Sequence, residues 1–178
     1  MDAPSETVGG LNISQTTFDF EEVFRAQYGR ITRVIARVVR DYGRSEELAA
    51  EVFWKLLRNP RAQGDQCVGW LHRTALRMSL NEIRREARQR RYESLFRFPR
   101  AIANPEEVHA AAEQQQRVRS VLAAMDRRQA ELLILRRQGF SYQDLASTLE
   151  MNPASLGTYL TRAQQTFRKE YFKRYADH

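Results

Sequence analysis

Cys67 is the only cysteine in the chain, which excludes an internal disulfide and leaves no CxxC pair for a zinc site. The three histidines, His72, His109 and His178, lie far apart, and no glycine-rich phosphate loop occurs. The sequence therefore predicts no enzyme, no metal and no cofactor. It also contains no apolar run near the roughly 20 residues of a membrane span, and no apolar leader at its start. We expect a cytoplasmic protein without membrane insertion, because a lone cysteine fits a reducing compartment.

Alternating strand patterns are absent as well, so the sequence predicts an all-α fold. Apolar residues recur every three or four positions in a long helix that begins at Phe18, in a second helix capped by Ser45, and in a third that starts near Val68. Composition changes after this third helix, where aromatic and proline residues break the period. We predict two small helical domains, at 18–91 and 106–178, joined by a linker at 92–105 and preceded by a flexible tail at 1–17.

The charge of the chain is positive and unevenly distributed. Lysine and arginine number 29 against 22 acidic residues, which gives a net charge of +7. Residues 69–100 contain nine arginines and three glutamates, whereas residues 1–23 contain five acidic residues and no basic one. An arginine-rich helix with aromatic neighbours favours a nucleic-acid partner. The alternative is a solvated helix face with intrahelical ion pairs, but three glutamates cannot neutralise nine arginines.

A short acidic ridge lies on the predicted second helix. Glu46 and Glu47 are expected in its first turn, where the helix dipole stabilises negative charge. Glu51 lies one turn further, beside Trp54, and the dipole does not explain it. This combination indicates a contact surface for a protein partner.

The C-terminal third has the pattern of a helix-turn-helix. Ser141 and Asp144 have the spacing of a capping box, and Asn152-Pro153 has the composition of a second helix start. The last helix is expected to run from Ala154 to about Tyr171. Its predicted outward face carries Ser155, Thr158, Tyr159 and Arg162. Such a face suits the DNA major groove, although tight helix pairs also occur in ordinary bundles.

Three motifs in this order resemble the sigma factors of bacterial RNA polymerase. Residues 45–53, SEELAAEVF, resemble the conserved region 2 helix. Residues 70–75, WLHRTA, followed by EIRR at 82–85, resemble the promoter-melting helix, and residues 122–168 resemble region 4. The short length points to the extracytoplasmic-function (ECF) group.

The resemblance implies a dissociable specificity subunit whose partners are core RNA polymerase, through the β′ clamp helices and the β flap, and promoter DNA. An anti-sigma factor is a further partner common in this group. The residues that would dock on the polymerase are Glu47, Glu51 and Trp54. Those that would bind the −10 element are Arg61, Gln63, Asp65, Arg77, Asn81, Arg84, Arg85 and Arg88. The −35 element would be read by Ser155, Thr158, Tyr159 and Arg162.

The sequence departs from the family pattern at several positions. Ala50 stands where glutamine is common, and Asn81 stands where aspartate is common. Glu150 occupies a turn position that usually carries glycine, and Gly157 falls inside the recognition helix, where glycine costs about 1 kcal/mol. Two other interpretations stay open at this point. One is a stand-alone helix-turn-helix regulator, and the other is an interaction protein whose basic helix binds RNA or acidic partners.

Overall fold

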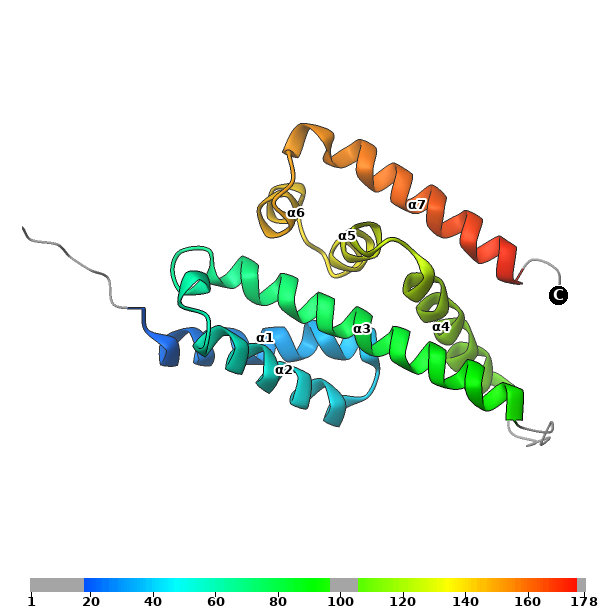
Figure 1. The fold of residues 1–178 in the computed structure, drawn as a ribbon. Helices are drawn as coiled ribbons and strands as arrows, with labels where there is room; N and C mark the ends of the chain where they lie inside the picture. Colours follow the sequence, from blue (N-terminus) through cyan, green and yellow to red (C-terminus); the bar gives the residue numbers. More distant parts are fainter. Residues whose placement is uncertain (1–17, 97–105, 176–178) are drawn as a thin grey trace, which may run out of the picture.

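The computed structural model describes residues 18–96 and 106–175, so the predicted tail and most of the predicted linker lie outside it. The described residues form seven α-helices and a short 3₁₀ turn, with no strand among them (Figure 1). The helices are α1 (Phe20–Val39), α2 (Tyr42–Leu57), α3 (Cys67–Phe96), α4 (Glu106–Ala124), α5 (Arg127–Arg137), α6 (Tyr142–Leu149) and α7 (Pro153–Tyr175), and the 3₁₀ turn η1 is Pro60–Ala62. The all-α prediction is confirmed.

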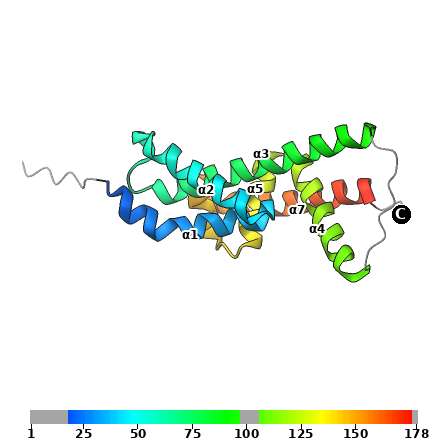
Figure 2. The ribbon, with the colours of Figure 1, turned by 90° about the horizontal axis from the view of Figure 1, so that it is seen from below.

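Helices α1, α2 and α3 pack together around the first of two apolar cores. Ile31, Ile35, Phe53 and Leu71 are almost wholly removed from solvent there. Each of them lies on the apolar stripe that the three- and four-residue spacing predicted. Figure 1 shows α1 and α2 along one side of α3, while α5, α6 and α7 lie along the other. In Figure 2, which is seen from below, α1 and α2 lie in front of α5 and α7. Helix α3 is therefore the element that connects both halves of the molecule.

The start of α2 differs from the prediction that Ser45 caps it. Arg40 takes a left-handed conformation with φ 66°, and Asp41 becomes the N-cap by accepting a 2.9 Å hydrogen bond from the Arg44 backbone N–H. Ser45 is buried inside the helix, where its hydroxyl donates to the Asp41 carbonyl. The Ser45 prediction is wrong, because the cap lies four residues earlier. Glu46 and Glu47, both predicted in the first turn, consequently lie beyond it, where the dipole effect has faded.

Helix α3 continues through Phe96, five residues beyond the predicted end of the first domain at 91. No proline or glycine occurs between 92 and 96 to stop it. Two intrahelical contacts support this last part of the helix, from Gln89 to Glu93 and from Arg90 to Glu86. The predicted linker therefore begins with helical residues.

The helix-turn-helix predicted at the C-terminal end is confirmed in its local detail. The Ser141 hydroxyl accepts the Asp144 N–H at 3.1 Å, and the Asp144 carboxylate accepts the Ser141 N–H at 3.1 Å, which completes a capping box. The Ser141 hydroxyl also donates to the Asp144 carboxylate, and this hydrogen bond, followed by that from the Ser141 N–H, lowers the pKa of Asp144. Helix α7 begins at Pro153, with the Asn152 side chain accepting the Ala154 N–H at 2.9 Å. Local sequence signals thus determine how α6 and α7 begin.

The two expected domains pack against each other over a second apolar core. Leu76 and Leu80 of α3 pack in one cluster with Val121 of α4, Leu135 of α5 and Leu145 of α6. Helix α3 lies directly against α4, α5 and α6. We call the contact of α1 and α3 with α4, α5 and α6 the seam. The division of the chain into two separate domains stays a proposal, since side chains of both expected domains share this core.

Candidate nucleic-acid and polymerase interface

The three predicted polymerase-docking residues share one exposed face of α2. Glu47, Glu51 and Trp54 follow one another at spacings of four and three, and the Trp54 side chain is 57% exposed. Glu51 forms a 3.2 Å ion pair with Lys55, and the Arg58 guanidinium lies over the Trp54 ring at 5.8 Å from its centroid. Leu57, which the sequence did not single out, is exposed beside them. An apolar centre with a charged rim resembles a protein-binding surface.

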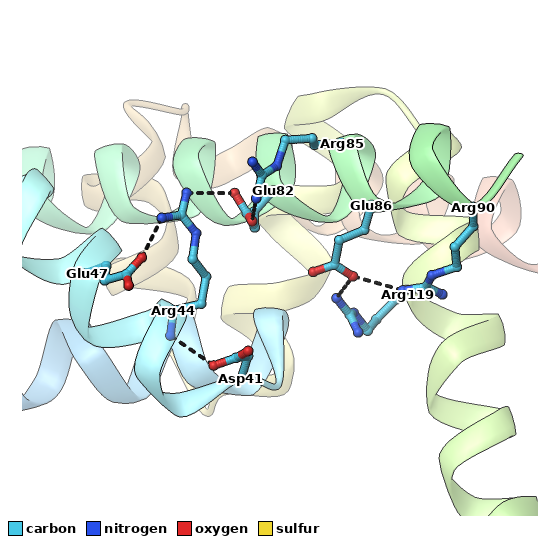
Figure 3. Close-up of polar contacts among 8 residues, drawn as sticks. All are labelled: Asp41, Arg44, Glu47, Glu82, Arg85, Glu86, Arg90 and Arg119. Carbon is cyan, nitrogen blue, oxygen red and sulfur yellow. Dashed lines mark hydrogen bonds and ion pairs between the residues drawn. The ribbon is translucent and has the colours of Figure 1, made fainter. Parts of the chain in front are cut away.

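Arg44 links this face to the arginine-rich helix α3 (Figure 3). Its guanidinium donates to Glu47 at 2.7 Å and to Glu82 at 3.1 Å, and Glu82 also accepts from Arg85. Glu82 is only 6% exposed, and the hydrogen bond from Arg44, followed by that from Arg85, lowers its pKa. The Arg44–Glu47 spacing of three was readable in the sequence. The contact to Glu82, 38 residues away, needed the fold.

The loop between α2 and α3 carries three of the residues predicted for the −10 element. Arg61 and Asp65 are exposed, as a DNA-binding role requires. Gln63 is half-buried, and its amide nitrogen donates to the carbonyls of Leu56 and Leu57 at 3.0 and 3.1 Å. Gln63 thus satisfies carbonyls at the end of α2, which leaves its amide oxygen as the group available to a base.

The other predicted −10 residues lie along α3 at spacings of three and four. The exposed ones are Arg77, Asn81, Arg85 and Arg88. Arg84 is different, because it is half-buried at the seam and donates to the carbonyls of Ala123 at 3.0 Å and Met125 at 3.1 Å. Together with Arg88 and three further arginines, Arg84 also lines a cleft of about 510 Å³ between α3, α4 and α7. The predicted −10 track is therefore partly open and partly engaged in the seam.

Intrahelical ion pairs neutralise some of the arginines of α3, as the alternative interpretation expected. Arg85 pairs with Glu82 and Arg90 with Glu86, and Glu86 also accepts from Arg119 of α4 (Figure 3). Among the described residues, Arg88 forms no ion pair. The pairing is thus incomplete, and an exposed positive stripe persists.

Arg73 holds the turn of the helix-turn-helix against α3. Its guanidinium donates to the Thr148 carbonyl at 2.7 Å and pairs with the Glu150 carboxylate at 2.8 Å. Glu150 occupies the left-handed region with φ 52°, the conformation for which glycine is usual. A left-handed residue costs about 1–2 kcal/mol for a side chain other than glycine. The ion pair to Arg73 offsets part of that cost.

The predicted −35 residues lie at the N-terminal end of α7. Thr158, Tyr159 and Arg162 are exposed, whereas Ser155 is half-buried and its hydroxyl donates to the Asn152 carbonyl at 3.0 Å. The opposite face of α7 is buried through Leu156, Leu160 and Ala163. A Cβ added at Gly157 would meet nothing within 4 Å, so packing does not require glycine there. The helix offers three freely accessible side chains to a groove.

Other chemistry is limited within the described part of the chain. Cys67 is buried, and burial raises the pKa of its thiol. The described residues contain no group of three or more histidine, cysteine, aspartate or glutamate side chains that could hold a metal ion. None of the described helices is long and apolar enough to cross a membrane. The side chains of His109 and His178 lie outside the described set.

Comparison with known proteins shows which proteins this chain resembles. Residues 115–166 match the family described as Sigma-70, region 4, a range that covers the second half of α4, α5, α6 and the first part of α7. Over 176 residues, the chain is 24% identical to the ECF RNA polymerase sigma factor SigE of Mycolicibacterium smegmatis, an alignment that covers 93% of this chain and 68% of that protein. The region 4 match and the alignment with SigE over nearly the whole chain support a sigma factor of the ECF type.

Among solved structures, this chain is similar to the sigma factor RpoE from Bartonella quintana, which was crystallised in complex with the anti-sigma factor NepR. The two are 17% identical with a TM-score of 0.49, and the match covers 86% of this chain and 97% of the other. The alignment with SigE includes the N-terminal helices as well as the helix-turn-helix. A stand-alone helix-turn-helix regulator would not account for that likeness, so this alternative is rejected.

Proposed function

We propose that this protein is a sigma factor of the ECF type, which binds core RNA polymerase and directs promoter recognition, DNA melting and transcription initiation, without a catalytic centre of its own. The observation that carries the proposal is the match of residues 115–166 to region 4, on a helix pair whose recognition face is exposed. The order of the acidic face on α2, the arginines on α3 and the helix-turn-helix supports it further. Its place of action is the cytoplasm, where bacterial polymerase meets promoter DNA.

The face of α2 is proposed to dock on the polymerase β′ clamp helices. Trp54 would supply the buried apolar anchor, since large aromatic side chains dominate many interfaces. Glu47 and Glu51 lie beside it and would meet basic groups of the partner. Arg44 already orients Glu47 through its 2.7 Å contact, which reduces the entropy lost on docking. We propose that the C-terminal helices contact the β flap.

Helix α3 and the loop before it are proposed to hold the melted −10 strand. Arg77 and Arg88 are exposed and suited to contact phosphates along the strand. Arg61 and Asp65 would meet a base lifted out of the stack, where polar side chains recognise its edge. Arg84 joins this track only after it releases the carbonyls of α4, because its donors are occupied in the packed structure. Binding of the −10 strand would therefore compete with packing at the seam.

The −35 element is proposed to be read by the first two turns of α7. Thr158, Tyr159 and Arg162 project from one side of the helix, opposite its buried stripe. An arginine in the major groove recognises guanine through two hydrogen bonds, a contact worth about 1–3 kcal/mol against a wrong base. Arg162 is the residue that we expect to determine most of the base preference.

Run-off transcription with purified core polymerase tests the proposed function, using promoter fragments from upstream of the gene's own operon. Transcripts should start only when the protein is added. Glu51→Lys should reduce them by about tenfold, which corresponds to about 1.4 kcal/mol. Glu113→Lys is the matched control, because Glu51 and Glu113 each form an exposed i,i+4 ion pair, with side chains 49% and 63% exposed. The control should stay within about twofold of the wild type.

Two results would count against this function. Equal losses for Glu51→Lys and Glu113→Lys would mean that α2 is not the docking face. Absence of transcripts together with failure to co-purify with core polymerase would reject the sigma mechanism itself. Co-purification without transcripts would point to an unsuitable promoter fragment, and footprinting of the complex on genomic fragments would then supply the right one.

A further inference from the structure

A cavity of about 360 Å³ opens at the seam, between α1 and the turn that joins α5 to α6. It is lined by Arg30, Arg33, Val34, Arg37, His72, Gln138 and Phe140. Four of these seven residues carry basic groups, and no carboxylate is among them. Both expected domains contribute, since α1 and α3 supply the basic groups and the turn supplies Gln138 and Phe140. The sequence analysis assigned no function to any of these residues.

The arginines of this cavity are not neutralised by carboxylates of the described residues. Arg30, Arg33 and Arg37 lie at spacings of three and four, on one side of α1. Arg33 donates one hydrogen bond, from Nε to the Gly29 carbonyl, at 3.0 Å. By contrast, Arg25 on the same helix is paired with Glu21. Three guanidiniums around one cavity create a positive potential that attracts an anion.

Two residues that line the cavity each have a buried polar atom without a partner in the described structure. His72 is only 8% exposed, and its Nδ1 forms no hydrogen bond. Gln138 donates its amide N–H to the Val34 carbonyl at 3.3 Å, but its amide oxygen is buried and unpartnered. Buried polar groups are nearly always paired with protein, water or ligand. These incompletely paired side chains line the same cavity as three arginines without carboxylate partners, a combination that favours a polar ligand.

We propose that this cavity binds the phosphate or diphosphate group of a small phosphorylated ligand, held by Arg30, Arg33 and Arg37 and by His72. Guanidinium groups present parallel donors that match phosphate oxygens in geometry and charge. The cavity is at the lower end of the volumes of small-molecule sites, and Phe140 with Val34 provides apolar wall beside the donors. Because its walls come from both sides of the seam, the ligand stabilises the packed arrangement of the two halves.

Ligand binding is coupled to a proton on His72. Burial, and secondly the charge of Arg30, lower the pKa of this histidine. Among the described residues that line the cavity with it are the three arginines of α1, Gln138 and Phe140, and none of these is acidic. A bound phosphate neutralises the arginines and accepts from the imidazolium, which raises the pKa. Binding therefore takes up a proton, so the contribution of His72 to the affinity grows as the pH falls toward the pKa of the bound imidazole.

Isothermal titration of the full chain with pyrophosphate, at constant ionic strength, tests the proposal. Arg33→Ala and Arg30→Ala should each weaken binding by about tenfold or more, because each removes a charge-assisted contact. Arg25→Ala is the matched control, since it removes one positive charge from the same helix outside the cavity, and it should change affinity by less than about twofold. His72→Gln should abolish the part of the pH dependence that the protein contributes. Melting curves without pyrophosphate verify that each variant is folded.

A second titration, with a single-stranded oligonucleotide, distinguishes a small ligand from the phosphates of a nucleic-acid backbone. Oligonucleotide binding that depends on Arg33, without pyrophosphate binding, would overturn the proposal. Pyrophosphate binding that survives Arg33→Ala and Arg30→Ala, or that falls equally in Arg25→Ala, would overturn it as well. Because these titrations use the free protein, their outcome is independent of the transcription experiment.

Discussion

Replacement of the buried carboxylate of Glu82 should destabilise the protein more than any exposed charge change. Glu82→Gln keeps the size of the side chain but removes the charge that Arg44 and Arg85 share. Breaking a fully buried pair costs about 3–5 kcal/mol. The Arg44 and Arg85 side chains are 33% and 62% exposed, so water compensates both in part and we expect a loss of about 2 kcal/mol. For a chain of this length, that lowers the melting temperature by roughly 4–8 °C.

The same contact makes this loss depend on pH. Since the pKa of folded Glu82 is lowered from its ordinary value of 4.5, the ionised carboxylate stabilises the folded state above that pH. This stabilisation disappears as the pH falls through the folded pKa. The difference between wild type and Glu82→Gln should be full at pH 7 and should vanish at strongly acidic pH, where both side chains are neutral.

Denaturant unfolding titrations of wild type and Glu82→Gln, at pH 7 and in a series below pH 4.5, measure the loss of unfolding free energy and its dependence on pH. Glu113→Gln is the control, because its ion pair with Arg117 is exposed and should contribute no more than about 0.5 kcal/mol. The reasoning is refuted by a Glu82→Gln loss no larger than that of the control. A loss that stays constant through acidic pH would equally refute the assignment of the effect to the charge.

Three further predictions concern the helix-turn-helix. Ser141→Ala removes the capping box with Asp144 and should lower the free energy of unfolding by about 1 kcal/mol in denaturant titrations, and an unchanged midpoint would contradict this. Glu150→Gly removes the strain of a left-handed residue, which should stabilise the fold by about 1–2 kcal/mol. It also removes the partly exposed ion pair with Arg73, which should cost at most about 1 kcal/mol. Its melting temperature should therefore rise, and a fall would show that the pair outweighs the backbone strain. Gly157→Ala should stabilise α7 by about 0.5–1 kcal/mol in the same titrations, because the added methyl group meets nothing within 4 Å.

Local signals in the sequence predicted the helix starts well where the capping residue had no competitor. Ser141 and Asn152 cap α6 and α7 as their spacing to Asp144 and Pro153 indicated. Ser45 had the same composition as a cap, yet Asp41 took that role and Ser45 became buried. Both residue types favour N-caps, and the choice between them depended on the left-handed turn at Arg40. N-cap propensity identifies the residues that could cap a helix, but the backbone conformation of the preceding residues decides which one does.

The sequence predicted which residue types lie on which helix face, but it did not predict which of these side chains are free to bind a partner. Glu47, Glu51 and Trp54 lie on one exposed face because helical spacing alone places them there. Arg84 was placed on the −10 track by the same reasoning, but it donates to carbonyls of α4 that are about 40 residues away. Contacts of this kind have no sequence period, since they depend on how two helices meet.

The sequence by itself determined that the protein is helical, where its helix-turn-helix begins, and which faces carry charge, because these follow from spacing and caps within a few residues. The tertiary structure alone decided which arginines stay exposed, that Glu82 is buried between Arg44 and Arg85, and that Arg30 and His72 meet at one cavity. Burial and the pairing of charges depend on neighbours that are distant in the chain. They are consequently properties of the packed seam rather than of any one segment.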